Sequence, residues 1–126
     1  MREILFRGKD IKGNWHIGLL AHIGNAWYIS NKTGVATAFE VIPETVGQYT
    51  GLTDKNGKKI FEGDIVRYGE TVHEVVFEQR NGTAYFGLVY SPLETLPFGH
   101  YQDLKQIEVI GNLHDNPELL KGGAEE

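Results

Sequence analysis

Histidines are the first side chains to consider for chemistry, because the chain has five of them and no cysteine. His16 and His22 fall on the same face of an expected strand, but six residues separate them, which is roughly 20 Å along an extended chain. No HxH or HExxH spacing brings another pair together. His114 and Asp115 are neighbours, yet adjacent side chains of an extended chain point to opposite faces. We therefore predict no metal site and no cofactor.

Nucleophilic and acid–base chemistry also lack a recognisable arrangement. The only serines are Ser30 and Ser91, and neither stands in a GxSxG sequence. Glu62 and Asp64 could share a strand face as a carboxylate pair, but a turn at Gly63 makes their separation unpredictable. The sequence contains neither of the phosphate-binding patterns GxxxxGK[ST] and GxGxxG. We predict that the protein is not an enzyme.

Two features of the sequence could serve in binding: a basic cluster and a large number of aromatic side chains. The formal net charge is −5, which disfavours non-specific nucleic-acid binding at long range. The basic cluster comprises Lys55, Lys58, Lys59 and Arg67, with Asp54, Glu62 and Asp64 among them, and is interpreted as a mixed, solvated face. Most of the rings are expected in the core, and any exposed ring would mark a protein interface or a stacking platform for single-stranded nucleic acid. They are Trp15, Trp27, Tyr28, Tyr49, Tyr68, Tyr85, Tyr90 and Tyr101.

Composition places these residues in one small cytoplasmic domain. The chain has 126 residues, which suits a single domain over residues 1–121 with a loose tail at 122–126. The absence of cysteine favours a reducing compartment. No apolar stretch has the length of a signal peptide core or a membrane span. We expect a cytoplasmic protein with no membrane partner.

Alternation and turn residues indicate a mainly β fold. From Trp15 to Ile23 every odd-numbered residue is apolar, which predicts a strand that buries that face. Asn81-Gly82 predicts a hairpin that pairs Phe77 with Phe86 and Val75 with Leu88. Asn56-Gly57 predicts a second hairpin, which pairs Asp54 with Lys59. Residues 91–100 contain two prolines and are expected as an irregular loop or an edge.

Short strands joined by glycine turns suggest a compact barrel or sandwich. Gly63 is expected to supply an unusual backbone angle, and the Asp64 carboxylate to cap amides of the same turn. Near the end of the chain Asn116, Pro117 and Glu118 have the order of a helix cap, which predicts a short C-terminal helical turn.

Residues 41–68 resemble the central signature of the YopX family. Its segments here are residues 43–52, 54–57 and 61–66, and residues 1–7, 109–113 and 116–120 resemble the start and close of the family sequence. The resemblance implies a phage or prophage origin and a mostly β fold with a small SH3-like barrel. It implies no reaction and no catalytic residues.

The signature has two interpretations. In the first it defines the fold, with Ile60, Phe61, Ile65 and Val66 in the core. In the second it forms a binding surface, whose candidate residues are Glu44, Tyr49, Lys55, Lys58, Glu62 and Asp64. The leading hypothesis is a non-catalytic module in a bacterial host cytoplasm that binds a host or phage protein or assembles with itself. The alternative is a nucleic-acid-associated accessory protein.

Overall fold

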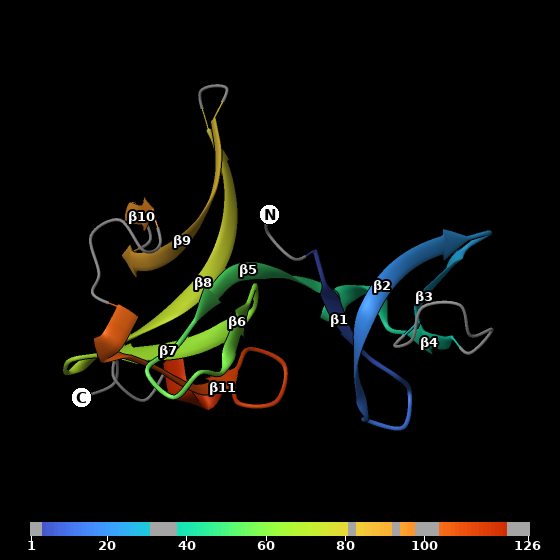
Figure 1. Ribbon diagram of the computed structural model, residues 1–126, viewed down its shortest axis with the longest axis horizontal. Helices are drawn as coiled ribbons and strands as arrows, with labels where there is room; N and C mark the ends of the chain where they lie inside the picture. The colour runs from blue at the N-terminus through green and yellow to red at the C-terminus, as the bar shows by residue number, and fades with distance from the viewer. Residues whose placement is uncertain (1–3, 31–37, 81–82, 92–93, 98–103, 121–126) are drawn as a thin grey trace. The chain divides into compact units, whose positions relative to one another are not determined.

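A computed structural model describes residues 4–30, 38–80, 83–91, 94–97 and 104–120. The chain forms two compact units, Met1–Gly51 and Leu52–Glu126. The fold is mainly β, as predicted, with two open antiparallel sheets in the described residues (Figure 1). Their strand orders are β4-β3-β2-β1-β5-β6 and β10-β9-β8-β7-β11, so neither sheet closes into the predicted barrel. The SH3-like element stays a prediction.

The first unit holds four strands and the start of a fifth. They are β1 (Phe6–Lys9), β2 (Trp15–Ile23), β3 (Ala26–Ser30), β4 (Phe39–Val41) and β5 (Gly47–Thr53), with the 3-10 turn η1 (Pro43–Thr45) before β5. The sheet curls, because Ile42, just after β4, donates its backbone N–H to Lys9 O at the end of β1 at 2.8 Å. Val41 packs so closely over Gly8 that a Cβ there would lie 2.9 Å from the valine Cβ. Glycine at position 8 therefore permits the curl.

The faces of β2 are the reverse of the prediction. The strand has the predicted bounds, but Ile17, Leu19 and Ile23 are exposed on its odd-numbered face, by 46%, 52% and 67%. The buried face carries Ile29 of β3, which is 0% exposed and lies opposite Leu20 of β2. Alternation identifies a strand without saying which face the rest of the sheet will cover. Here the curl encloses the even-numbered face.

The second unit contains the remaining strands: β6 (Lys59–Phe61), β7 (Asp64–Tyr68), β8 (Thr71–Arg80), β9 (Thr83–Ser91), β10 (Glu94–Pro97) and β11 (Ile107–Asn112). The 3-10 turn η2 (Leu104–Gln106) precedes β11, and one helical turn at 118–120 confirms the predicted C-terminal helix. The core cluster consists of Ile60, Val66, Val75, Leu88 and Ile107, each 0% exposed. Ile60, Phe61, Ile65 and Val66 are all buried, as predicted for the signature.

The β8–β9 hairpin confirms the predicted register. Val75 lies opposite Leu88 and Phe77 opposite Phe86. The rings of Phe77 and Phe86 are 5.0 Å apart, although Phe77 remains 41% exposed. Asn81-Gly82 at the tip lies outside the described residues, as does the predicted tail at 122–126. Among the described strands β10 pairs only with β9 and is an edge strand, one of the two alternatives predicted there.

The turn at Asn56-Gly57 differs from its prediction. Asp54 donates its backbone N–H to Lys58 O at 2.8 Å, so Asp54 pairs with Lys58 across three intervening residues, and the predicted pairing of Asp54 with Lys59 is wrong. The Asp54 carboxylate accepts from the backbone N–H groups of Asn56 at 2.8 Å and Lys58 at 2.9 Å. The Asp54 carboxylate thus accepts hydrogen bonds from two amides of the turn. These bonds stabilise the turn without the two-residue type I′ geometry that was predicted.

Candidate binding surfaces

The exposed side of the first sheet carries several large apolar side chains of β2. We call it the outer face and define it by Ile17, Leu19, Ala21 and Ile23 of β2, with the residues opposite them on neighbouring strands. Register places Arg7 and Lys9 of β1 and Tyr28 of β3 on this face, and Glu40 of β4 opposite Tyr28. Three large aliphatic side chains thus stand along the central strand.

Cations line one edge of the outer face and a carboxylate lies at the other. The Arg7 guanidinium lies 4.9 Å and the Lys9 ammonium 5.7 Å from the centre of the Trp15 ring. Cations at this distance over an indole are attracted by its π-electrons. Glu40 is exposed on β4, two strands away from Trp15. In the strand order the cations and the carboxylate thus lie on opposite sides of the aliphatic side chains of β2.

Two histidines help to hold β2 in this orientation. On the even-numbered face the half-buried His16 stacks on Phe39 with the ring centres 4.0 Å apart, and the exposed His22 stacks on Trp27 at 4.1 Å. The His16 Nε2 lies 2.8 Å from a carboxylate oxygen of Asp10. That hydrogen bond, with backbone N–H groups of Asn14 and Lys12, lowers the pKa of Asp10 to about 2. These histidines have structural partners.

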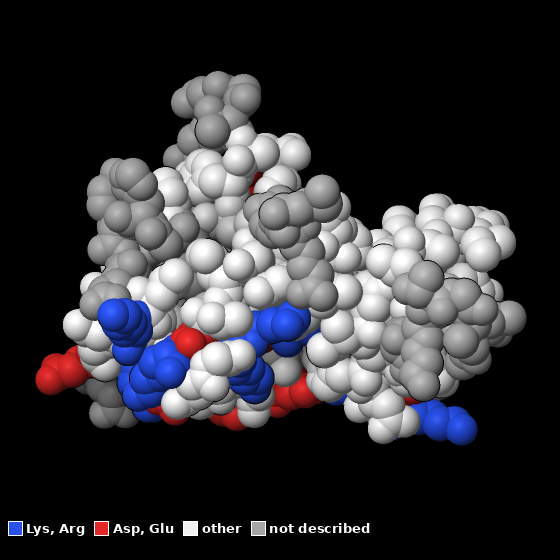
Figure 2. Space-filling view, in the orientation of Figure 1, with Lys and Arg blue, Asp and Glu red and all other residues white. Residues whose placement is uncertain are grey.

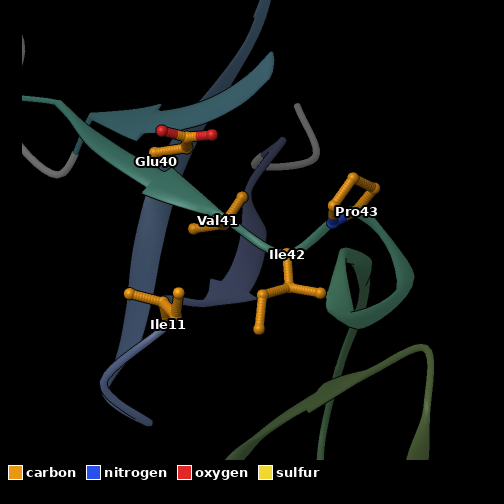
Figure 3. Close-up of a pocket in the computed structure, with 5 residues that line it drawn as sticks. All are labelled: Ile11, Glu40, Val41, Ile42 and Pro43. Carbon is orange, nitrogen blue, oxygen red and sulfur yellow. The ribbon is translucent and has the colours of Figure 1, made fainter. Parts of the chain in front are cut away.

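A shallow apolar pocket lies near the end of β4 (Figure 3). It has a volume of about 250 Å³ and is lined by Ile11, Glu40, Val41, Ile42 and Pro43. Ile11, from the turn after β1, is 91% exposed and Ile42 is 38% exposed. In Figure 3 the Glu40 carboxylate points away from Ile11 and Ile42. The pocket thus offers aliphatic contact without a converging polar group.

The second unit carries a basic hollow of about 320 Å³, lined by Lys55, Gly69, Arg67, Lys105, Gln106 and Glu108. Figure 2 shows Lys and Arg side chains gathered over the part of the chain that contains β7 and β11, with acidic side chains among them. Lys55 and Arg67 belong to the predicted basic cluster. Sequence reasoning missed Lys105, because only the pairing of β11 with β7 brings the two distant segments together.

The six candidate residues of the signature divide between the two units. Glu44 is exposed in η1 and Tyr49 is 6% exposed in β5, both in the first unit. In the second unit Lys55 and Lys58 are exposed, Glu62 is half-buried and Asp64 is 1% exposed. Asp64 accepts the backbone N–H of Phe61 at 2.8 Å, and Gly63 has a φ of +94°, which confirms the predicted turn. The six-residue binding surface stays a prediction.

Buried carboxylates in the second unit have structural partners too. Asp54 is 6% exposed, and its second oxygen accepts the backbone N–H of Val109 at 2.9 Å. Burial acts to raise the pKa of Asp54, but the N–H groups of Val109, Lys58 and Asn56 together hold it below its usual value. Burial and then the nearby charge of Glu62 raise the pKa of Glu74.

Neither a metal centre nor a membrane span is found in the part of the chain that the structure describes. No three His, Asp or Glu side chains there lie close enough to hold a metal ion. No helix in the same part is long and apolar enough to cross a bilayer. Among the predicted aromatic residues that are described, Tyr49 is buried and Tyr90 is 37% exposed.

Comparison with known proteins identifies a family and similar solved structures. The family described as YopX protein matches residues 18–121. The crystal structure of protein EF1440 from Enterococcus faecalis is similar, with 24% sequence identity and a TM-score of 0.54, over 95% of this chain and 99% of that one. A search of the curated proteins found no match. The structural similarity extends to the fold and carries no statement about activity.

Proposed function

The chain belongs to the YopX protein family, and from that premise we propose that it is a non-catalytic protein-binding module whose outer face pairs with a second copy of the same chain. The observation that carries the proposal is the exposure of Ile17, Leu19 and Ile23 side by side on one strand. Contiguous apolar side chains that face solvent are typical of interaction sites. Single apolar residues scattered over a surface would not indicate such a site.

The layout of charge favours a second copy as the partner. Two sheets related by a two-fold axis parallel to their strands would place β1 of one chain over β4 of the other. Lys9 of each copy would then face Glu40 of its partner, while β2 of each copy packs beside the axis, over β3 of the other. A two-fold axis across the strands would place the cations of both copies together, and like charges disfavour it.

Curvature limits the strength of this pairing. The outer face lies outside a curled sheet, so two copies would touch mainly along β2. A narrow contact of this kind resembles the small interfaces of transient complexes. We therefore expect weak self-association that depends on concentration.

Light scattering coupled to gel filtration, over a series of protein concentrations, tests the proposal. The unaltered protein should shift from monomer to dimer, and Leu19→Lys should remain a monomer at the same concentrations. Ile11→Lys is the matched control, because it also replaces an exposed isoleucine of the first unit but one outside the outer face. A monomer at all concentrations, or equal loss in both variants, would overturn the proposal.

Charge reversal tests the orientation of the two copies. Glu40→Lys and Lys9→Glu should each weaken dimerisation by about tenfold, which corresponds to about 1.4 kcal/mol. The double variant should recover most of the affinity because the pair of charges is restored in reverse. If the double variant is weaker than either single variant, the proposed two-fold axis is wrong.

Origin and location complete the proposal. We place the protein in the cytoplasm of a bacterial host, as the product of a phage or prophage. This origin is the one that the resemblance of residues 41–68 implies, and the lack of cysteine supports a reducing compartment.

A further inference from the structure

A buried histidine links the three central strands of the second sheet. His73 of β8 is 5% exposed, and its Nδ1 lies 2.9 Å from the backbone oxygen of Val89 in β9. Its Nε2 lies 2.7 Å from the hydroxyl oxygen of Thr71, two residues earlier on the same face of β8. That hydroxyl oxygen lies 2.9 Å from the backbone oxygen of Tyr68 in β7. The four groups thus form a chain of three contacts, which runs from β9 through β8 to β7.

The three contacts need three protons to become three hydrogen bonds. Both ends of the chain are carbonyl oxygens, which only accept. A neutral imidazole supplies one N–H and the Thr71 hydroxyl supplies one O–H, so neutral His73 leaves one contact without a proton. When the Nδ1–H donates to Val89, the Thr71 hydroxyl can donate to His73 Nε2 or to the Tyr68 oxygen, but not to both. An imidazolium carries a proton on each nitrogen, and every contact then has its own.

The last contact of the chain closes the β7–β8 turn. Tyr68 ends β7, Thr71 begins β8, and the two residues lie opposite each other in the register. Between them Gly69 has a φ of +64°, which favours glycine. A Thr71 hydroxyl that donates to Tyr68 therefore adds a side-chain hydrogen bond across this turn. A hydroxyl that donates to His73 removes that bond, so the protonation state of the histidine reaches the backbone of the turn.

Tyrosines are the titratable side chains that face His73 from the neighbouring strands in the described part of the unit. The centre of the Tyr90 ring of β9 lies 4.2 Å from that of the imidazole, at a tilt of 41°. The register places Tyr68 of β7 on the same face, together with Val66, which lies opposite His73. A phenol is uncharged at neutral and acidic pH, and an aromatic ring attracts a cation. The core cluster packed on this face is apolar.

Charged side chains near His73 lie on the other face of the sheet or at the turn. Alternation places Glu74 of β8 and Arg67 of β7 on that other face, and Glu108 of β11 lies opposite Arg67. Glu70 is exposed within the turn, and Lys105 lines the basic hollow beside the same turn. Burial acts against a charged imidazole, whereas the additional hydrogen bond and the Tyr90 ring act in its favour.

We propose that His73 is a pH-sensitive switch for the β7–β8 turn. In acid the imidazolium donates to Val89 and to the Thr71 hydroxyl, which donates to Tyr68, so that all three bonds are made. As the pH rises, Nε2 loses its proton to solvent. The Thr71 hydroxyl then donates to Nε2, and the Tyr68 oxygen loses this bond. Histidine is the side chain that ordinarily changes charge between about pH 5 and 8.

Nuclear magnetic resonance of the full chain with isotope-labelled histidine tests the proton count. The ring nitrogen signals of His73 should show a proton on Nδ1 throughout, and a proton on Nε2 that is present at about pH 5 and absent at about pH 8. A neutral ring with its proton on Nε2 would overturn the proposal, because Nδ1 would then offer no proton to Val89. An Nε2 whose protonation does not change over this range would also overturn it.

The carbonyl carbon signal of Tyr68 reports the bond that the switch controls. It should shift with pH at the same midpoint as the His73 ring, because the Thr71 hydroxyl donates to one acceptor or the other. Thr71→Val removes the hydroxyl but keeps the branched shape, so the Tyr68 response should be lost. Thr71→Ser keeps a hydroxyl and should retain the response. Because Thr71 is exposed, both variants should fold.

Two further variants separate the switch from other titrating groups. Glu74→Gln removes the carboxyl next to His73, whose pKa is raised by burial and then by the charge of Glu62. His22→Gln removes an exposed histidine of the first unit. Both should leave the Tyr68 response intact. The proposal is overturned if either variant abolishes that response, or if Thr71→Val keeps it. None of these results depends on dimerisation through the outer face.

Discussion

Asp54 shows how an acidic residue of the signature serves the fold. Its two carboxylate oxygens accept three backbone N–H groups, two within its own turn and one, Val109, from β11. The side chain therefore closes a turn and joins it to a strand more than fifty residues away. Sequence spacing predicted a turn here, but it contained no sign of Val109 as a partner.

Asp54→Ala should destabilise the protein by about 3 kcal/mol, because buried N–H groups lose their acceptor. Chemical denaturation at neutral pH measures the loss, and Glu44→Ala serves as a control at an exposed carboxylate. The lowered pKa of Asp54 means that its contribution is present above its ordinary pKa and is lost as the pH falls through the lowered one. The difference between the unaltered protein and Asp54→Asn should therefore shrink in acid.

Glu74 is predicted to have the opposite effect on stability. Burial, and secondarily the charge of Glu62, raise its pKa, so the folded protein loses stability as the pH rises through this raised value. Glu74→Gln should increase the melting temperature at neutral pH, and the increase should vanish at a pH below the ordinary pKa of glutamate. Glu62→Gln should give a smaller increase. A lower melting temperature for Glu74→Gln at neutral pH would contradict this account.

At the scale of elements, β2 shows the limit of a period-two pattern. Its bounds follow from alternation, but the buried face is chosen by the strands on either side. The rings of His16 and His22 stack on those of Phe39 and Trp27. Gly8 has no side chain, so Val41 can pack against the backbone of β1. The apolar odd-numbered residues are left for another surface, which we assign to a second copy.

Substitutions on the two faces of the first sheet should therefore differ sharply. Ile17→Lys should change the free energy of unfolding by no more than about 0.5 kcal/mol, as for other surface positions. Ile29→Ala should cost about 2–5 kcal/mol because it empties a fully buried site. Urea denaturation at concentrations where the protein is monomeric measures both. Equal costs would indicate that the odd-numbered face is buried after all.

Gly8 is the residue on which the curl of the sheet depends most directly. A methyl group at this position would lie within 2.9–3.1 Å of three Val41 carbons, closer than carbon atoms normally pack. Gly8→Ala should cost about 1–3 kcal/mol, the usual range for overpacking. Val41→Gly would remove all three of these carbons, so the double variant should lose less than the sum of the two single losses. Additive losses in denaturation experiments would argue against the contact.

For the whole molecule, β5 is the strand that belongs to both units. Its start pairs with β1 in the first unit, and its last residues, Leu52 and Thr53, belong to the second. A hydrogen-bonded strand that runs without a break between two compact units can couple their unfolding. We therefore propose that residues 1–121, which the sequence predicts to be a single domain, unfold cooperatively.

Calorimetry tests that proposal with one core substitution in each unit. Ile29→Ala in the first unit and Ile65→Ala in the second should both lower the melting temperature of one shared transition. The calorimetric and van't Hoff enthalpies should agree, as they do for two-state unfolding. Two separate transitions, each sensitive to only one substitution, would show that the units are independent domains.

The sequence by itself determined the features that depend on neighbours along the chain. The β8–β9 register, the turn at Gly63-Asp64 and the C-terminal helical turn follow from local patterns of turn residues and alternation. The signature, residues 41–68, was enough to identify the family.

Tertiary structure alone decided which surfaces are free and which distant residues meet. Burial of a strand face depends on the strands that pack against it, so only the curled sheet shows Ile17, Leu19 and Ile23 outside. The basic hollow depends on the pairing of β7 with β11, which places Lys105 near Arg67 across a long separation in sequence. His16, His22 and His73 lie against aromatic rings or hydrogen-bond partners, because the fold sets their neighbours.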